Sequence, residues 1–418
     1  MKILKIIPIF FISFTTTFAS KQKTFIICLG GWNSTSGDGW TNLAQQIQRD
    51  KGYDIISENE KFSDKDRKDN TVISYDIHID TIDEDIEVQA KRLHSALKKM
   101  GIENGDNIVL VALSQGGLRA WAFLKEYNKD YNIRGLFSAG SPWGGAHILN
   151  SNKRANEWKE DMEDKVTDAM ESIPLIGFLI DAVGLEEMLD PVTDKLVEEL
   201  VYHDFAYNEG SKFMRPEIGA NGEEQNVFLS DIYKPKETGE GKETYFGAYI
   251  GTDPDIFKTW LLDHEGMIED AKDVVDVLVI TSDILYSPFS LLPFMPDRSE
   301  LSINLMGVSS CLEQEIINAW WSYLITSDFG DHNHDALIKV EDQYIEPHVL
   351  KSIKGVKGRY IGGDRGSSNV KVSAGHTTSS ARYKTTREIL YNDFEVIAGI
   401  SGWVYKIMDE IGEEVKNG

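Results

Sequence analysis

The run Asn107–Trp121 constrains the fold more than any other part of the chain. It reads Asn-Ile-Val-Leu-Val-Ala-Leu-Ser-Gln-Gly-Gly-Leu-Arg-Ala-Trp, and Ile108–Leu113 within it is continuously apolar. A short apolar run of this kind predicts a strand that is covered on both faces, as in a parallel sheet. Apolar residues then recur at helical spacing after two glycines. The run therefore predicts a buried strand, a sharp turn and a helix.

Ser114 stands at the corner between this strand and this helix. A serine on such a strained turn presents its hydroxyl at the carboxyl edge of the sheet, where it can act as a nucleophile. The residues two before and two after it must be small, and they are Ala112 and Gly116. The usual pattern is Gly-x-Ser-x-Gly, so alanine replaces the first glycine here. Taken alone, the corner fits a structural turn as well as a nucleophile.

The first third of the chain alternates between strand and helix patterns. This alternation predicts an α/β fold with a mostly parallel, doubly wound sheet. The expected strands are Thr24–Leu29, Thr71–Ile77, Ile108–Leu113 and Ile133–Ala139, and the expected helices are Trp40–Ile47, Asp83–Met100 and the helix after Ser114.

The 418 residues divide into four predicted parts. Regular alternation stops after Gly145, and we interpret residues 146–300 as a largely helical cap inserted over the active edge of the sheet. The other parts are a signal peptide (1–19), the N-terminal part of the core (20–145) and its C-terminal part (301–418). The last part is expected to contain strands at Ser302–Val308 and Val370–Ala374 and, over Thr385–Ile411, a long amphipathic closing helix or helix pair.

Residues 1–19 have the pattern of a secretory signal: Lys2 and Lys5, then a short apolar core, then Thr17-Phe18-Ala19 as a small-residue cleavage site. They predict a secreted or periplasmic protein, with a retained N-terminal anchor as the alternative. Of the two cysteines, Cys28 falls in a predicted central strand, so we expect a buried free thiol rather than a bridge to Cys311. The net charge of −25 argues against nucleic-acid binding.

Acyl transfer by serine requires a base, an acid that orients the base, and backbone donors for the oxyanion. His376 is the expected base because it follows a short strand among small residues and precedes the last helix. Asp335 is the expected acid, since it leads into an apolar segment that can hold it. Asp328, Asp331 and Asp283 remain alternatives, and the Asp-rich loop around Asp331 could instead bind calcium. No other cofactor is expected.

The oxyanion donors are expected to be the backbone N–H of Gln115 and that of Trp32 or Gly31. Gln115 follows the serine, and Gly31 and Trp32 lie in the turn after the first strand. A Gly-Gly turn lets the backbone come close to a substrate oxygen. A plain glycine turn is the alternative for this loop.

Ser138–Gly145, Ser-Ala-Gly-Ser-Pro-Trp-Gly-Gly, together with the Ser114 corner, resembles the lecithin–cholesterol acyltransferase and lysosomal phospholipase group of serine α/β-hydrolases. Secreted bacterial lipases are similar more loosely. The resemblance covers Thr24–Gly145 and then islands around Asp335 and His376. It implies ester hydrolysis or acyl transfer on lipids by Ser114, Asp335 and His376. Two departures stand out: Gly30 occupies the place of the usual oxyanion-loop histidine, and Ala336 that of the usual glycine after the acid.

The apolar run Ile173–Leu189 between acidic flanks suggests a lid that opens against a lipid surface, and hence a long-chain acyl substrate. An ordinary core helix of the cap is the alternative. The expected partner is a lipid or other acyl ester, with transient membrane contact through 173–189 and no nucleic acid. An acyltransferase, a thioesterase and a catalytically silent binding protein on the same fold are kept as other readings.

Overall fold

The computed structural model describes residues 22–34, 36–64, 70–150, 208–216, 226–236, 241–254, 322, 325–326, 332–363, 368–376 and 388–417. Its centre is an eight-stranded sheet in which every strand pairing is parallel. The strand order is β2-β3-β1-β4-β5-β6-β7, and β8 also pairs with β6. The strands are β1 (Thr24–Leu29), β2 (Asp54–Ile55), β3 (Thr71–Ser74), β4 (Asn107–Leu113), β5 (Asn132–Ala139), β6 (Lys242–Gly251), β7 (Val356–Tyr360) and β8 (Asn369–Val372).

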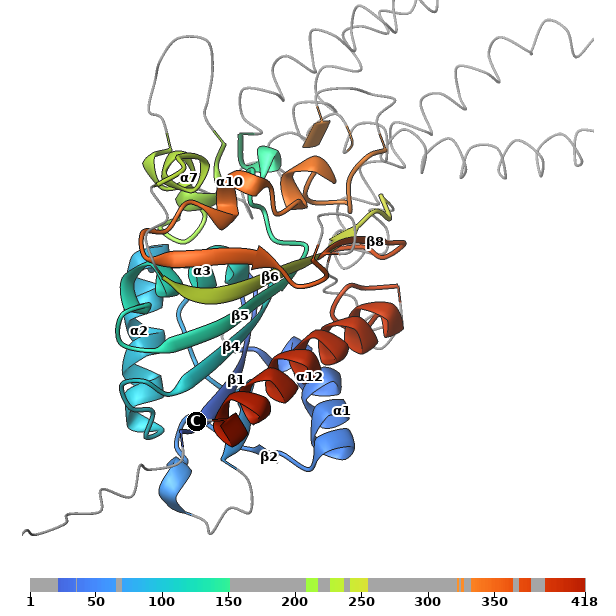
Figure 1. Ribbon diagram of the computed structural model, residues 1–418. Helices are drawn as coiled ribbons and strands as arrows, with labels where there is room; N and C mark the ends of the chain where they lie inside the picture. The colour runs from blue at the N-terminus through green and yellow to red at the C-terminus, as the bar shows by residue number, and fades with distance from the viewer. Residues whose placement is uncertain are drawn as a thin grey trace, which may run out of the picture.

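Helices cover both faces of this sheet (Figure 1). On one face lie α2 (Ile86–Lys99) and α3 (Gln115–Tyr127), and on the other lie α1 (Thr41–Lys51) and the long α12 (Phe394–Asn417). Successive residues of the central strands point to opposite faces of the sheet and pack in two separate hydrophobic cores. Ile27 packs in the core under α2 and α3, and Cys28 packs in the core under α1 and α12. Burial on both faces explains why β1 and β4 are continuously apolar.

Shorter elements complete the described part of the chain. The helices α7 (Val227–Tyr233) and α10 (Pro347–Leu350) contact each other and lie above β6 and β7 in Figure 1. Single 3-10 turns occur at Asp38–Trp40, Phe62–Asp64, His147–Asn150, Lys212–Met214 and Glu341–Gln343. Within the residues described, no helix combines the length and the apolar character that crossing a membrane requires.

Most of the expected elements are present. β1 has the expected bounds, β3 is shorter than expected, and the closing helix begins at Phe394 rather than near Thr385. Cys28 is buried and free, and burial raises the pKa of its thiol to about 12. Residues 1–19, 173–189 and 302–308, and with them Cys311, Asp283, Asp328 and Asp331, lie outside the described residues.

One expectation is wrong: residues 146–300 are not all cap, because β6 is a strand of the sheet within that range. β6 lies between β5 and the last two strands, with Leu136 paired to Phe246 on one side. Its first half pairs with β7 and its second half with β8, so the two short strands share one edge of β6. The chain leaves the sheet after Tyr360 and returns at Asn369, four residues before Ser373 and the turn that carries His376.

Candidate active site

Ser114 has the unusual backbone angles φ 52° and ψ −129° between β4 and α3. A non-glycine residue with such angles costs about 1–3 kcal/mol and requires support from its surroundings. Its N–H donates to the Ala139 carbonyl at 2.9 Å, which extends the β4–β5 pairing by one bond, and its carbonyl accepts from Gly117 N–H at 3.0 Å. The sharp strand-to-helix turn expected at this serine is therefore present.

The two glycines after the serine are required by close backbone approach. A Cβ at position 116 would lie 2.5 Å from the Gly30 carbonyl oxygen, and one at position 117 would lie 2.2 Å from Ser141 Oγ. The first turn of α3 is thus packed directly against the loop after β1 and against the Ser138–Gly145 motif. The expectation that position 116 must be small is explained by this contact with Gly30.

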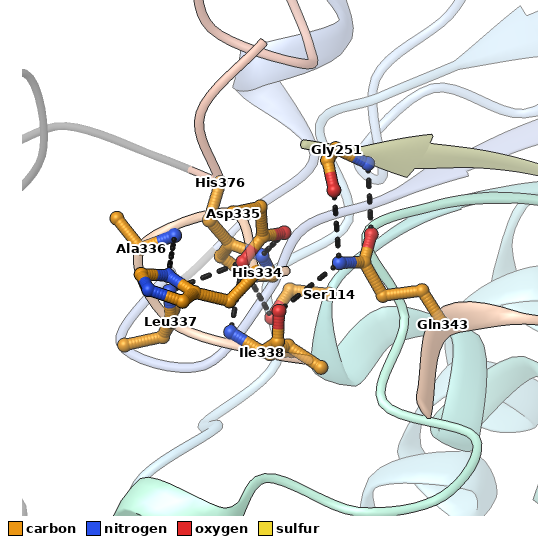
Figure 2. A network of polar contacts seen from close by, with 9 residues as sticks. All are labelled: Ser114, Gly251, His334, Asp335, Ala336, Leu337, Ile338, Gln343 and His376. Atoms are coloured by element: carbon orange, nitrogen blue, oxygen red, sulfur yellow. Dashed lines mark hydrogen bonds and ion pairs between the residues drawn. The ribbon is translucent and has the colours of Figure 1, made fainter. Parts of the chain in front are cut away.

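His376 lies within hydrogen-bonding distance of the serine, with Nε2 2.8 Å from Ser114 Oγ (Figure 2). It follows β8, as expected, and its ring is 1% exposed. Gly140, in the Ser138–Gly145 motif, has φ 58°, and a Cβ there would stand 2.9 Å from His376 Nδ1. The motif therefore forms one wall of the histidine's site, which only a glycine permits.

Asp335 is fully buried and lies on the far side of the histidine ring, with Oδ2 2.7 Å from His376 Nδ1. Its other oxygen, Oδ1, accepts from Leu337 N–H at 3.1 Å and from Ile338 N–H at 2.8 Å. Because the carboxylate can only accept, His376 Nδ1 carries the proton and Nε2 presents a lone pair to the serine hydroxyl. The three expected residues are brought together in the order serine, histidine, aspartate.

A tight turn holds the carboxylate, and Ala336 in that turn has φ 70°. Glycine adopts this left-handed conformation without strain, whereas an alanine does not, so Ala336 is a strained residue in this chain. His334 supports the turn, because its Nδ1 accepts from Ala336 N–H at 3.0 Å (Figure 2). The opposite ring nitrogen of His334 lies 2.8 Å from Ser322 Oγ. Because Nδ1 accepts a hydrogen bond, a neutral His334 carries its proton on Nε2. Both ring nitrogens are therefore used in supporting the acid turn, and His334 is not available as a second base.

Gln343 joins the acid turn to the end of β6, a link that the sequence alone did not reveal. Its side chain accepts from Gly251 N–H at 2.9 Å and donates to the Ile338 carbonyl at 3.2 Å (Figure 2). A Cβ at Gly251 would lie 2.8 Å from Asp335 Cβ, so glycine is needed where the strand meets the acid. Asp335 thus reaches the carboxyl end of β6 in space, although 84 positions separate it from Gly251 along the chain.

The candidate oxyanion donors lie around the serine. A Cβ at Gly31 would stand 3.0 Å from Ser114 Cβ and 3.5 Å from its Oγ, so the Gly31 backbone lies directly against the serine. Gln115 begins α3, and its side chain donates to the Gly210 carbonyl at 2.7 Å. The Trp32 indole donates to Asn208 Oδ1 at 3.3 Å. One segment, Asn208–Gly210, therefore binds the side chains of two of the three expected residues.

A buried cation supports this loop from the α3 side. Arg119 is 2% exposed, and its Nη2 donates to the Gly30 carbonyl at 2.7 Å. Burial lowers the pKa of this guanidinium to about 10, which leaves it charged at neutral pH. The sequence did not predict this contact, because Arg119 appears there only as a single charged residue in an expected helix.

The described residues contain no group of three or more His, Cys, Asp or Glu side chains arranged to hold a metal ion. The calcium alternative concerns Asp328 and Asp331, which lie outside those residues. Asp335, the third acid of that loop, uses both oxygens on His376 and on backbone N–H groups.

No protein-family model and no curated protein sequence matches the chain. Among solved structures, it is similar to a metagenomic carboxyl esterase, with 9% identity over 93% of this chain and 76% of the esterase, at a TM-score of 0.36. The Bacillus licheniformis lipase BlEst2 shares 11% identity over 81% of this chain and 84% of the lipase, at a TM-score of 0.31. The phospholipase PlaB from Legionella pneumophila shares 11% identity over 56% of this chain and 40% of the phospholipase, at a TM-score of 0.30.

Identities and TM-scores this low do not assign a substrate or an activity to this chain. The resemblance to the lecithin–cholesterol acyltransferase group rests on sequence motifs alone. The fold class follows from the molecule itself. Its parallel sheet is wound with helices on both faces, Ser114 stands on the strand-to-helix turn after β4, and the aspartate and histidine follow in chain order. This arrangement is the α/β-hydrolase fold that the sequence predicts.

Proposed function

We propose that the chain is a serine hydrolase that cleaves carboxylic esters through an acyl-enzyme on Ser114. The observation that carries the proposal is the continuous hydrogen-bonded path from Ser114 Oγ to His376 and on to Asp335, with heavy-atom distances of 2.8 and 2.7 Å. A base within this distance of a hydroxyl, itself oriented by a buried carboxylate, is the arrangement that activates a serine.

In this mechanism, Ser114 Oγ attacks the ester carbonyl carbon while His376 Nε2 takes the hydroxyl proton. Asp335 stabilises the resulting imidazolium and does not itself become protonated. His376 then gives the proton to the leaving alcohol as the ester bond breaks. A water molecule then attacks the acyl-enzyme while His376 Nε2 takes its proton. His376 gives this proton to Ser114 Oγ as the acyl–oxygen bond breaks, which releases the carboxylic acid and restores the serine hydroxyl.

Backbone N–H groups of Gly31 or Trp32 and of Gln115 are proposed to bind the oxyanion formed in each step. Gly31 lies against the serine, and Gln115 is the residue that follows it, as this role requires. Such donors supply a large share of the rate enhancement in acyl transfer because they are already oriented before charge develops.

For the substrate, we propose an acyl ester of a lipid. The proposal rests on the sequence motif Ser138–Gly145 and on the apolar run Ile173–Leu189, which would cover the site and open against a lipid surface. We further propose that residues 1–19 direct export and are removed after Ala19. N-terminal sequencing of the exported protein tests the second point, and a mature chain that still begins at Met1 contradicts it.

The test of the function is a chain-length series of p-nitrophenyl esters with wild type, Ser114→Ala and His376→Ala side by side. We expect turnover by wild type and losses in kcat on the order of 10³-fold or more in both variants. The lipid proposal predicts that activity rises with acyl length and increases further on emulsified substrate. Equal turnover by wild type and Ser114→Ala would contradict the acyl-enzyme.

A further inference from the structure

Arg119 is a buried cation for which the described residues provide no carboxylate partner. Among the described residues its guanidinium makes one hydrogen bond, to the Gly30 carbonyl, and its buried Nε makes none. An uncompensated charge in a protein interior costs several kcal/mol, far more than one bond to a carbonyl returns. A buried arginine whose contacts among the described residues are limited to one backbone carbonyl, in the helix that begins at the nucleophile, therefore calls for an explanation in terms of function.

The geometry of the peptide bond links this arginine to the oxyanion site. In a planar trans peptide unit, the carbonyl and the N–H point in opposite directions. Arg119 holds the carbonyl of Gly30, so the N–H of the same unit, which belongs to Gly31, points away from the guanidinium. Gly31 lies directly against Ser114, because a Cβ there would be 3.0 Å from Ser114 Cβ. The arginine thus fixes the plane of the peptide unit that carries a candidate oxyanion donor.

A second residue of the same helix also lies against the Gly30 carbonyl. A Cβ at Gly116 would lie 2.5 Å from the Gly30 oxygen and 3.1 Å from the Leu29 oxygen, so the carbonyl is held against the first turn of α3. Gly116 and Arg119 are three positions apart and share one face of α3. One helix therefore positions the nucleophile at its start and, one turn later, holds the loop that faces the nucleophile.

From this arrangement we propose that Arg119 is a positioning residue of the oxyanion hole, acting through the Gly30–Gly31 peptide unit. The inference rests on the proposed function. The guanidinium orients the Gly31 N–H and also strengthens it as a donor, since a cation on a carbonyl oxygen polarises the whole peptide unit. Arg119 thus supports the oxyanion loop at Gly30, the residue that precedes the candidate donor Gly31.

The test compares Arg119→Met and Arg119→Lys with a matched control, Arg134→Met. Arg134 is also a buried arginine, but it binds Glu414 of α12 from β5 and lies away from the nucleophile. Each variant is assayed for kcat and KM on p-nitrophenyl butyrate, for thermal melting, and for inhibition by a trifluoromethyl ketone. That inhibitor forms a tetrahedral oxyanion adduct with an active serine, so its affinity reports on the oxyanion donors.

Removing one oxyanion donor costs about 10²–10³-fold in kcat, and misaligning one is expected to cost about 10–10²-fold. We expect this loss in Arg119→Met, with KM little changed and with the inhibition constant for the ketone raised by a similar factor. Arg119→Lys keeps the charge and most of the volume, and is expected to fold and to show an intermediate loss. Arg134→Met is expected to melt earlier than wild type while keeping kcat and the inhibition constant.

A folded Arg119→Met or Arg119→Lys with the kcat and the ketone affinity of wild type would overturn the inference. An equal fall of both quantities in Arg134→Met would also overturn it, because the effect would then follow from loss of any buried arginine. Absence of ester turnover in wild type is a separate outcome that contradicts the proposed function itself.

Discussion

Replacing Asp335 by asparagine should move the proton of His376 from Nδ1 to Nε2 while the backbone stays in place. In the wild type, Asp335 Oδ1 accepts two backbone N–H bonds and Oδ2 accepts from His376 Nδ1. An asparagine has one acceptor oxygen and one NH₂ group to fill these two positions. If the oxygen faces the backbone, the NH₂ group faces Nδ1, which must then accept. The proton moves to Nε2, and the base that faces Ser114 becomes a donor.

The structure decides between the two orientations of the amide. The reverse orientation would leave the N–H groups of Leu337 and Ile338 buried without an acceptor, at about 1–3 kcal/mol each. The orientation that disables the base is therefore strongly favoured. The same change in serine proteases lowers kcat about 10⁴-fold, which corresponds to about 5 kcal/mol at 1.36 kcal/mol per tenfold change. We expect a loss of this order in Asp335→Asn, with little change in melting temperature.

The assay is ester turnover measured together with thermal melting, with Asp253→Asn as the control. Asp253 is another carboxylate that follows a strand of the sheet, two residues after the end of β6. The control should keep full turnover. Asp335→Asn with turnover within about tenfold of wild type, or loss of turnover in Asp253→Asn instead, would refute the tautomer argument.

Three further changes test other parts of the account. Gly140→Ala adds a Cβ 2.9 Å from His376 Nδ1 at a residue with φ 58°, so it should lower kcat by at least about tenfold and the free energy of unfolding by about 1–2 kcal/mol. Ala336→Gly relieves a residue with φ 70°, so it should raise the free energy of unfolding by up to about 1 kcal/mol in chemical denaturation with turnover unchanged. Hydrogen bonds from Arg134 hold the pKa of Glu414 below its ordinary value of 4.5, so wild type should melt slightly above Glu414→Gln at neutral pH, and this difference should disappear as pH falls below 4.5. Unchanged turnover in Gly140→Ala, lower stability in Ala336→Gly, or a melting difference that grows on acidification would each contradict the corresponding step.

The central strands and the nucleophile turn were predictable because their burial and crowding determine which residue types occur in them. β1 and β4 are buried on both faces, and continuous apolar runs are the direct consequence of that burial. Gly116 was also predictable, since crowding at a strand-to-helix turn excludes a side chain. The contact that excludes it, with the Gly30 carbonyl, required coordinates.

β6 was missed although Tyr245–Ile250 is largely apolar, because the strand follows a polar stretch rich in glycine and glutamate and is interrupted by Gly247. It begins with Lys242 and Glu243 and contains Gly247, where a Cβ would lie 2.7 Å from Trp403 of α12. Its neighbour β7 alternates exposed charged residues with partly buried ones, which is typical of an edge strand. The local patterns of β6 and β7 are compatible with strands, but their places in the sheet depend on pairings between residues far apart in the chain.

The support of the site was also beyond the sequence. Asp335 could be chosen from the apolar segment after it, but the link through Gln343 to Gly251 joins positions far apart in the chain. Arg119 appears in the sequence as one charged residue in a helix, and only its burial against Gly30 identifies it. A side chain that acts through the backbone of a distant residue leaves no recognisable spacing between motif residues in the sequence.

The central claim is that Ser114 is a nucleophile activated by His376. The direct measurement is reaction of the full chain with a fluorophosphonate, followed by mass spectrometry of the digested protein. The account predicts one adduct per chain, on the peptide that contains Ser114, which is absent in Ser114→Ala and strongly reduced in His376→Ala. An unmodified Ser114 throughout pH about 6–9, or an adduct on another residue at equal yield, would contradict it.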